Sequence, residues 1–149
     1  MYQTLNGLKY LRDMKILHRD IKGKYLLFYL HPIEANILLT REGVLKICDF
    51  GLARKFNKEN SSTAFSGDKI TLNYRPPEML LTTSALHYTT AVDVWSMGVV
   101  FLNLLRGNWV IIGKNSDDVL RSIVNYLGTR RSAVLTMLIL SKRYYQCHF

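Results

Sequence analysis

Three oxygen-bearing side chains, Asp20, Asn36 and Asp49, occur close together in the N-terminal part of the chain. Asn36 and Asp49 offer hard oxygen ligands of the type that Mg²⁺ prefers beside phosphate oxygens and water. Each residue alone also has a simpler interpretation, because an Asp near a Gly is typical of a turn and an Asn before a strand is typical of a cap. The choice depends on the elements that position these side chains.

A helix followed by two strands is predicted around these residues. Residues 3–15 show helical spacing and are expected to bury one stripe of side chains. The stripe consists of Leu5, Leu8, Leu11 and Met14. The segments "NILLT" and "VLKICDF", separated by "REG", are typical of two short strands joined by a glycine-containing turn. Asn36 would then begin one strand and Asp49 would end the next.

The middle of the chain changes from a loop to helices. Residues 51–74 are polar with little periodicity, which is typical of a long loop that carries function. Pro76-Pro77 ends this loop, and a short helix is expected to begin at Glu78, since proline is tolerated in a first helical turn.

Two longer helices are predicted after it. Residues 91–105 are hydrophobic nearly all round, so this helix is expected in the middle of the core. Thr89 and Thr90 are its candidate caps, and Ser116 begins a second capped helix that Gly128 closes. The predicted fold is therefore mainly α with a few short strands.

Composition limits the class of protein. The chain has 149 residues and 48% apolar content, which suits one globular core. A formal net charge of +9 favours acidic partners, but the basic residues are scattered and do not alternate with aromatic ones. Specific nucleic-acid binding is therefore the least favoured function. No apolar run approaches the roughly 18 residues of a membrane span, so no membrane partner is expected. Cys48 and Cys147 lack the neighbours that make a zinc site.

Five motifs follow one another along the chain. They are "LHRDIK" at 17–22, "ANILL" at 35–39, "LKICDFGLAR" at 45–54, "ITLNYRPPEMLL" at 70–81 and "DVWSMGVVF" at 93–101. In this order they resemble the C-terminal lobe of a eukaryotic protein kinase. Within these motifs, the segments "TREGVLKICDFGLARKF" and "YRPPEMLL" are most similar to those of the cyclin-dependent kinases that act on RNA polymerase and transcription elongation. The resemblance implies a partial protein-kinase-like fold over residues 1–149.

The resemblance implies ATP- and Mg²⁺-dependent phosphoryl transfer to Ser or Thr of protein substrates. This reaction needs a hydroxyl aimed at the γ-phosphate and cations that neutralise the phosphate oxygens. By resemblance, Asp20 accepts or orients the proton of the substrate hydroxyl, and Lys22 steadies the transferring phosphate. Asn36 and Asp49 are implied to bind the metal ion and, with it, ATP.

Further positions are implied in regulation and substrate binding. Arg19 would grip a phosphate on the activation loop, because a guanidinium pairs bidentately with phosphate. Ser66 aligns with the phosphorylated position of that loop, with an ordinary loop serine as an equal alternative. Thr71 and Arg75 belong to the implied substrate platform. Asn73 replaces a Trp of the family and is expected to weaken that platform.

Three residues have implied structural roles. Asp93 is expected to accept backbone N–H groups of the His18-Arg19 turn, because a buried carboxylate must be satisfied by donors. Glu78 pairs in the family with a distant Arg, for which Arg143 is the candidate here. An unpaired surface arginine is the alternative for Arg143.

Residues 24–34 interrupt the catalytic loop. In the family the Asn follows the Asp after a few residues, whereas Asn36 follows Asp20 by sixteen positions. Closing a longer loop costs only about 0.6 kcal/mol per doubling of its length. Displacing the reactive groups by about 1 Å costs on the order of 100-fold in rate. The stretch is either an insertion or a translated intron in a misassembled gene product.

The resemblance also defines what the sequence lacks. It contains no glycine-rich loop, strand lysine or helix glutamate of the kind that orients ATP, and residues 129–149 resemble a shortened, degenerate end. We therefore expect the chain alone to be inactive, and most of the docking surface for a cyclin partner to be missing. A catalytically dead binding module is the alternative function. A nuclear location is implied by the resemblance, and a cytoplasmic one otherwise.

Overall fold

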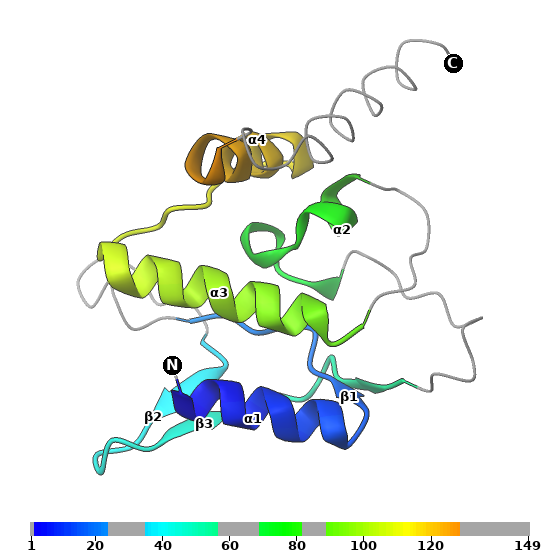
Figure 1. Cartoon of the computed structure of the whole chain (residues 1–149), viewed down its shortest axis with the longest axis vertical. Helices are drawn as coiled ribbons and strands as arrows, with labels where there is room; N and C mark the ends of the chain where they lie inside the picture. Colours follow the sequence, from blue (N-terminus) through cyan, green and yellow to red (C-terminus); the bar gives the residue numbers. More distant parts are fainter. Residues whose placement is uncertain (1, 24–34, 57–68, 82–88, 129–149) are drawn as a thin grey trace.

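The computed structural model describes residues 2–23, 35–56, 69–81 and 89–128. The elements in chain order are α1 (Tyr2–Asp13), β1 (Ile16–Leu17), β2 (Ile37–Leu39), β3 (Leu45–Ile47), β4 (Arg54–Lys55), the 3₁₀ helix η2 (Leu72–Tyr74), α2 (Pro77–Leu81), α3 (Ala91–Arg106) and α4 (Ser116–Leu127). Helix α3 lies between α1 on one side and α2 and α4 on the other (Figure 1). The prediction of a mainly helical chain with a few short strands is confirmed.

The described strands form two small antiparallel sheets. Strands β2 and β3 pair with Ile37 opposite Ile47 and Leu39 opposite Leu45, which confirms the predicted hairpin. Gly43 has a φ of 78° in its turn, a conformation that glycine adopts without steric cost. Strands β1 and β4 pair with Leu17 opposite Arg54, and the sequence did not predict this pairing.

Helix α1 covers most of the predicted segment 3–15 but ends at Asp13, and its buried residues differ from the predicted stripe. Leu8 and Leu11 are buried, whereas Leu5 is 40% exposed and Met14 is 52% exposed. Met14 lies beyond the end of α1 at Asp13. Within the helix, residues three apart are rotated by about 60° relative to one another, so Leu5 turns away from the side on which Leu8 and Leu11 are buried. Thr4 is buried beside Leu8 and Leu11.

Helix α3 packs on the core with one side rather than lying in its middle. Its buried residues are Val92, Asp93, Ser96, Met97, Val99, Val100 and Asn103. Val94, Phe101, Leu104 and Leu105 are between 36% and 69% exposed. The expectation of a helix buried all round is therefore wrong for the described part of the chain. Apolar residues occur on the exposed side of α3, and polar residues occur on its buried side.

The caps of the two long helices are partly those predicted. Thr89 Oγ1 accepts the N–H of Ala91 at 3.3 Å, while Thr90 makes no capping bond with its side chain. Asn115, rather than Ser116, caps α4 by accepting the N–H of Asp118 at 2.9 Å.

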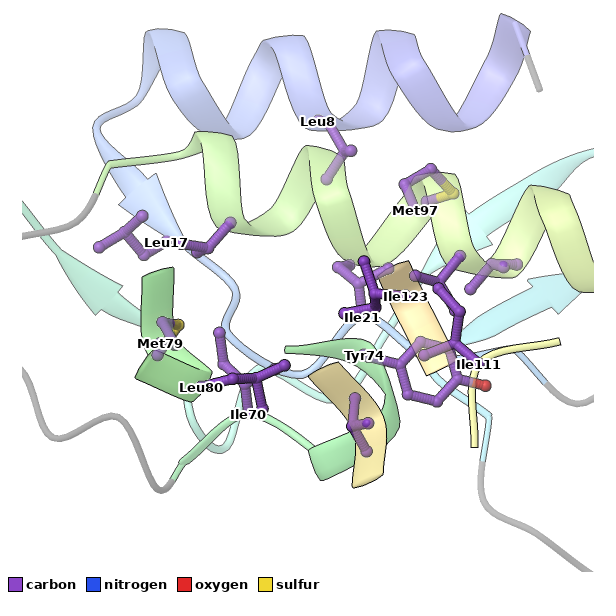
Figure 2. Close-up of a cluster of buried hydrophobic side chains, with 14 of the residues drawn as sticks. Leu8, Leu17, Ile21, Ile70, Tyr74, Met79, Leu80, Met97, Ile111 and Ile123 are labelled. Carbon is purple, nitrogen blue, oxygen red and sulfur yellow. The ribbon is translucent and has the colours of Figure 1, made fainter. Parts of the chain in front are cut away.

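The core is formed by side chains from α1, α2, α3 and α4, from Tyr74 of η2, and from the segment that follows β1. Figure 2 shows Leu8 of α1, Ile21, Met97 of α3, Leu80 of α2 and Ile123 of α4 in this cluster. Within the described ranges, no helix combines the length and hydropathy that crossing a membrane requires.

Candidate active site

The carboxylate of Asp20 is held by three side chains from three separate segments. Thr71 Oγ1 donates to Asp20 Oδ1 at 2.8 Å, and Asn36 Nδ2 donates to Asp20 Oδ2 at 2.8 Å. Lys22 Nζ lies 3.0 Å from Asp20 Oδ2. Asp20 is only 6% exposed. Both carboxylate oxygens are thus occupied by donors, which fixes the orientation of the group.

Asn36 lies beside Asp20 although sixteen positions separate them in the sequence. Its Nδ2 also donates to the backbone oxygen of Asp20 at 2.7 Å. The N–H of Asn36 donates to the carbonyl of Lys22 at 3.1 Å. The segments on the two sides of residues 24–34 therefore meet directly, and the side chains that the sequence separated are brought together.

Asp49 follows a residue that is bonded to the Asn36 backbone. The N–H of Cys48 donates to the carbonyl of Asn36 at 2.9 Å, so Asp49 emerges at the same end of the hairpin. Asp49 is exposed and has a φ of 61°, which is uncommon for a residue other than glycine. Its Oδ1 accepts the N–H of Gly51 at 3.3 Å.

The oxygens of Asn36 and Asp49 fit a magnesium ion in their chemistry. Because Nδ2 of Asn36 donates to Asp20, Oδ1 is the atom of that amide that could ligate a cation. Asp49 supplies a carboxylate, and such oxygen ligands are those that Mg²⁺ takes together with phosphate oxygens. Among the residues that the structure describes, no three His, Cys, Asp or Glu side chains gather in a cluster that could hold a metal ion.

Asp93 fixes the backbone of the turn that precedes Asp20. Its Oδ2 accepts the N–H of His18 at 2.8 Å and its Oδ1 accepts the N–H of Arg19 at 2.9 Å, as the resemblance led us to expect. Arg19 has a φ of 67° in this turn. Burial raises the pKa of the Asp93 carboxyl, and the two backbone hydrogen bonds oppose that rise. A carboxylate in this position stabilises a backbone conformation that is otherwise costly.

His18 has a role that the sequence analysis did not assign. The ring is fully buried, its Nε2 lies 2.9 Å from the carbonyl of Cys48, and its Nδ1 accepts the N–H of Asp20 at 3.3 Å. A neutral ring that accepts at Nδ1 carries its proton at Nε2 and donates it to Cys48. The His18 ring also meets Phe50 edge to face at 4.9 Å. His18 thus links Asp20 to Cys48, the residue before Asp49. Its position two residues before Asp20 is the feature of the sequence that could have indicated this role.

The substrate platform predicted around Thr71 and Arg75 has its own anchors. Arg75 Nε donates to the carbonyl of Ile70 at 2.6 Å. Asn73 Oδ1 accepts the N–H of Gly113 at 3.2 Å, so the residue that replaces the family's Trp still ties the platform to the loop before α4. A Cβ on Gly113 would lie 2.5 Å from the N of Val119, which explains the glycine at this contact.

Of the remaining predicted residues, the structure describes Arg19 and Glu78 but not Ser66 and Arg143. Arg19 Nε donates to the carbonyl of Leu52 at 2.8 Å, and Arg19 is buried. Glu78 is exposed on α2. Ser66 and Arg143 lie outside the described residues, so the phosphosite and the Glu78–Arg143 pair stay predictions.

The fold and the site together define the C-terminal lobe of a protein kinase. The family model described as "Protein kinase domain" matches residues 1–137, and the chain therefore belongs to the protein kinase family. Cyclin-dependent kinase C-2 of Oryza sativa subsp. japonica is 42% identical over 129 residues, which are 87% of this chain and 22% of that protein. CTD kinase subunit alpha of Saccharomyces cerevisiae is 42% identical over 127 residues, 85% of this chain and 21% of that protein.

A solved structure agrees with these relatives. The crystal structure of the yeast RNA Pol II CTD kinase CTDK-1 complex superposes with a TM-score of 0.65 and 42% sequence identity over 81% of this chain and 34% of that chain. The resemblance to kinases of the cyclin-dependent type is confirmed. The chain spans about a fifth of the length of the curated relatives named above. The interpretation of residues 24–34 as an insertion and of 129–149 as a degenerate end stays a prediction.

Proposed function

We propose that this chain carries the phosphoryl-transfer centre of a serine/threonine protein kinase of the cyclin-dependent type. The observation that carries the proposal is the Asp20 carboxylate, which Thr71, Asn36 and Lys22 hold at 2.8 to 3.0 Å. Phosphoryl transfer depends mainly on positioning and electrostatic stabilisation, and this arrangement supplies a positioned carboxylate with a cation beside it.

Each side chain has a separate task in the proposed reaction. Asp20 orients the substrate hydroxyl and accepts its proton, while Lys22, 3.0 Å away, steadies the transferring phosphate. Asn36 and Asp49 would hold Mg²⁺, which neutralises charge on the phosphate oxygens of ATP when it is bound. Thr71 keeps the carboxylate aligned from the side of the substrate platform.

The substrates and partners are proposed from the relatives. The solved relative is named as an RNA Pol II CTD kinase complex. We propose that the substrate of this chain is likewise a Ser-containing segment of a protein. A cyclin partner and a nuclear location follow from the same likeness. The 149 residues contain no glycine-rich loop, strand lysine or helix glutamate for ATP. The 149-residue chain by itself is therefore proposed to be a poor catalyst.

Transfer of the γ-phosphate from ATP to a Ser-containing peptide, with Mg²⁺ present, tests the proposal. We expect transfer by the chain to fall by about 100-fold or more in Asp20→Asn, because the group that orients the hydroxyl is lost. Asp13→Asn is the matched control, since Asp13 is an exposed carboxylate at the end of α1 bonded to Lys9 and Arg12. Transfer above background that is equal in the two variants would contradict the proposal. Peptide binding without transfer would support the alternative, a catalytically dead binding module.

A further inference from the structure

The chain on the two sides of residues 24–34 has the geometry of an interrupted β-turn. Gly23 precedes these residues and Ala35 follows them. The N–H of Asn36 donates to the carbonyl of Lys22 at 3.1 Å. If residues 24–34 were absent, Lys22, Gly23, Ala35 and Asn36 would be consecutive, and this bond would be the one that closes a β-turn. The closing bond exists although the chain between its partners is much longer than a turn.

Gly23, where the chain departs, is held on two sides. A Cβ at Gly23 would lie 2.7 Å from Cγ1 of Val100, so the side chain of Val100 occupies the space that any other residue would need. The hydroxyl oxygen of Tyr74 lies 3.3 Å from the carbonyl oxygen of Gly23, to which it donates, and 3.5 Å from the backbone N of Gly23, from which it accepts. Both polar distances are long for hydrogen bonds, so close packing on Val100 is the tighter of the two contacts.

Tyr74 is itself fixed in place. It is 2% exposed, its ring meets Trp109 edge to face at 6.1 Å, and its carbonyl accepts from Ser96 Oγ at 2.9 Å. Burial raises the pKa of the Tyr74 hydroxyl to about 12. The hydroxyl is the donor in its contact with the carbonyl of Gly23. Tyr74 and Val100 come from η2 and α3, which do not belong to the catalytic loop.

We propose that Tyr74 and Val100 are positioning residues that clamp Gly23, so that the chain makes its excursion through residues 24–34 without displacing Asp20, Lys22 or Asn36. The catalytic meaning of this clamp rests on the proposed function. The clamp as such is a property of the fold, and it is measurable whether or not the chain transfers phosphate.

Hydrogen–deuterium exchange of the Asn36 amide tests the clamp, because this amide closes the interrupted turn. The full chain and a variant that lacks residues 24–34 are each compared with and without Tyr74→Phe, which keeps the ring and removes the hydroxyl. In the full chain we expect Tyr74→Phe to speed exchange by about tenfold, since the turn is then closed by one contact fewer. In the shortened chain the covalent turn replaces the clamp, and the change is expected to stay below about twofold.

A role of Tyr74 in general stability would accelerate exchange equally in both chains, and that result would overturn the proposal. No change in the full chain would overturn it as well. Tyr10→Phe is the matched control, because Tyr10 is 64% exposed on α1.

A second pair of variants tests the contact with Val100. Gly23→Ala in the full chain is expected to speed exchange at Asn36 by about tenfold because of the 2.7 Å contact. Adding Val100→Ala frees that space and is expected to return exchange to within about twofold of the original chain. Failure of the second change to compensate the first would contradict the clamp. Since no readout is phosphate transfer, failure of the proposed function would appear only in the transfer assay.

Discussion

The two sides of helix α3 differ in what they contact. The inner side carries polar residues that are bonded to two loops and to η2. Asp93 accepts from His18 and Arg19, Ser96 donates to the carbonyl of Tyr74, and Asn103 accepts from Val110. The outer side carries exposed apolar residues. These are Val94, Phe101, Leu104 and Leu105.

The difference shows that hydropathy alone does not select the buried side of α3, because that side combines four apolar residues with Asp93, Ser96 and Asn103. A buried polar side chain is stable where it satisfies backbone groups that would otherwise be unpaired. Two loops and the 3₁₀ helix η2 are thereby fixed on one helix, and one of the loops leads to Asp20. Substitutions on the inner side should therefore cost far more than substitutions on the outer side.

The largest effect is expected for Asp93→Ala. This change leaves the N–H groups of His18 and Arg19 without their acceptor. A buried unsatisfied donor costs about 1–3 kcal/mol, so the free energy of unfolding should fall by about 2–4 kcal/mol in total, after relief of the buried charge. Urea unfolding followed by tryptophan fluorescence measures it.

The matched substitution on the outer side is Val94→Ala, one position along the helix. Val94 is 51% exposed, and the expected change is within about 0.5 kcal/mol. Similar losses for the two variants would remove the distinction between the sides.

A smaller loss is expected for Asn103→Ala. Asn103 is 8% exposed, and its Oδ1 accepts the N–H of Val110 at 3.0 Å. Loss of this bond should lower the free energy of unfolding by about 1–2 kcal/mol and free the loop before α4. Leu104→Ala, with Leu104 45% exposed, is the neighbouring outer-side control. Unchanged exchange of the Val110 amide in Asn103→Ala would show that this contact does not hold the loop.

The pH dependence of stability at alkaline pH tests the burial of Tyr74, whose carbonyl accepts from Ser96 on the inner side of α3. Burial raises the pKa of the Tyr74 hydroxyl from its ordinary value of 10.0 to about 12 in the folded chain. Between these values the unfolded chain has lost the proton that the folded chain retains. The free energy of unfolding therefore falls as the pH rises above about 10, by up to about 1.4 kcal/mol per pH unit.

Urea unfolding of the original chain and of Tyr74→Phe at about pH 9 and about pH 11 measures this contribution. The phenylalanine variant should lose less stability over the interval. An identical loss in the two chains would mean that Tyr74 is not buried as described.

The sequence predicted the positions of the helices and strands better than it predicted which face of each helix is buried. The β2–β3 hairpin and the helices follow from local periodicity and turn residues, which the sequence displays directly. The buried side of α3 does not follow from them, since Asp93, Ser96 and Asn103 are buried by bonds to distant loops. On α1, the expected stripe failed because a three-residue spacing drifts around the helix.

The candidate site was predictable as a set of residues but not as an arrangement. Motif order indicated Asp20, Lys22, Asn36 and Asp49, yet the long gap before Asn36 left its position undecided. The bond between Asn36 and Lys22, and the packing of Gly23 against Val100, depend on contacts between distant segments. Such contacts have no signal in local periodicity. The roles assigned to the four residues stay proposals.

An effect of the opposite sign is expected for Gly98→Ala on the outer side of α3. A Cβ built at Gly98 meets no atom within 4 Å, whereas one at Gly23 would meet Val100 at 2.7 Å. Alanine is favoured over glycine inside a helix by about 0.5–1 kcal/mol, so the free energy of unfolding should rise by that amount. Urea unfolding of the two glycine variants side by side measures both signs. A loss of stability in Gly98→Ala would mean that a Cβ at this position meets another part of the folded chain, and the outer side of α3 would then be a packed surface like the inner one.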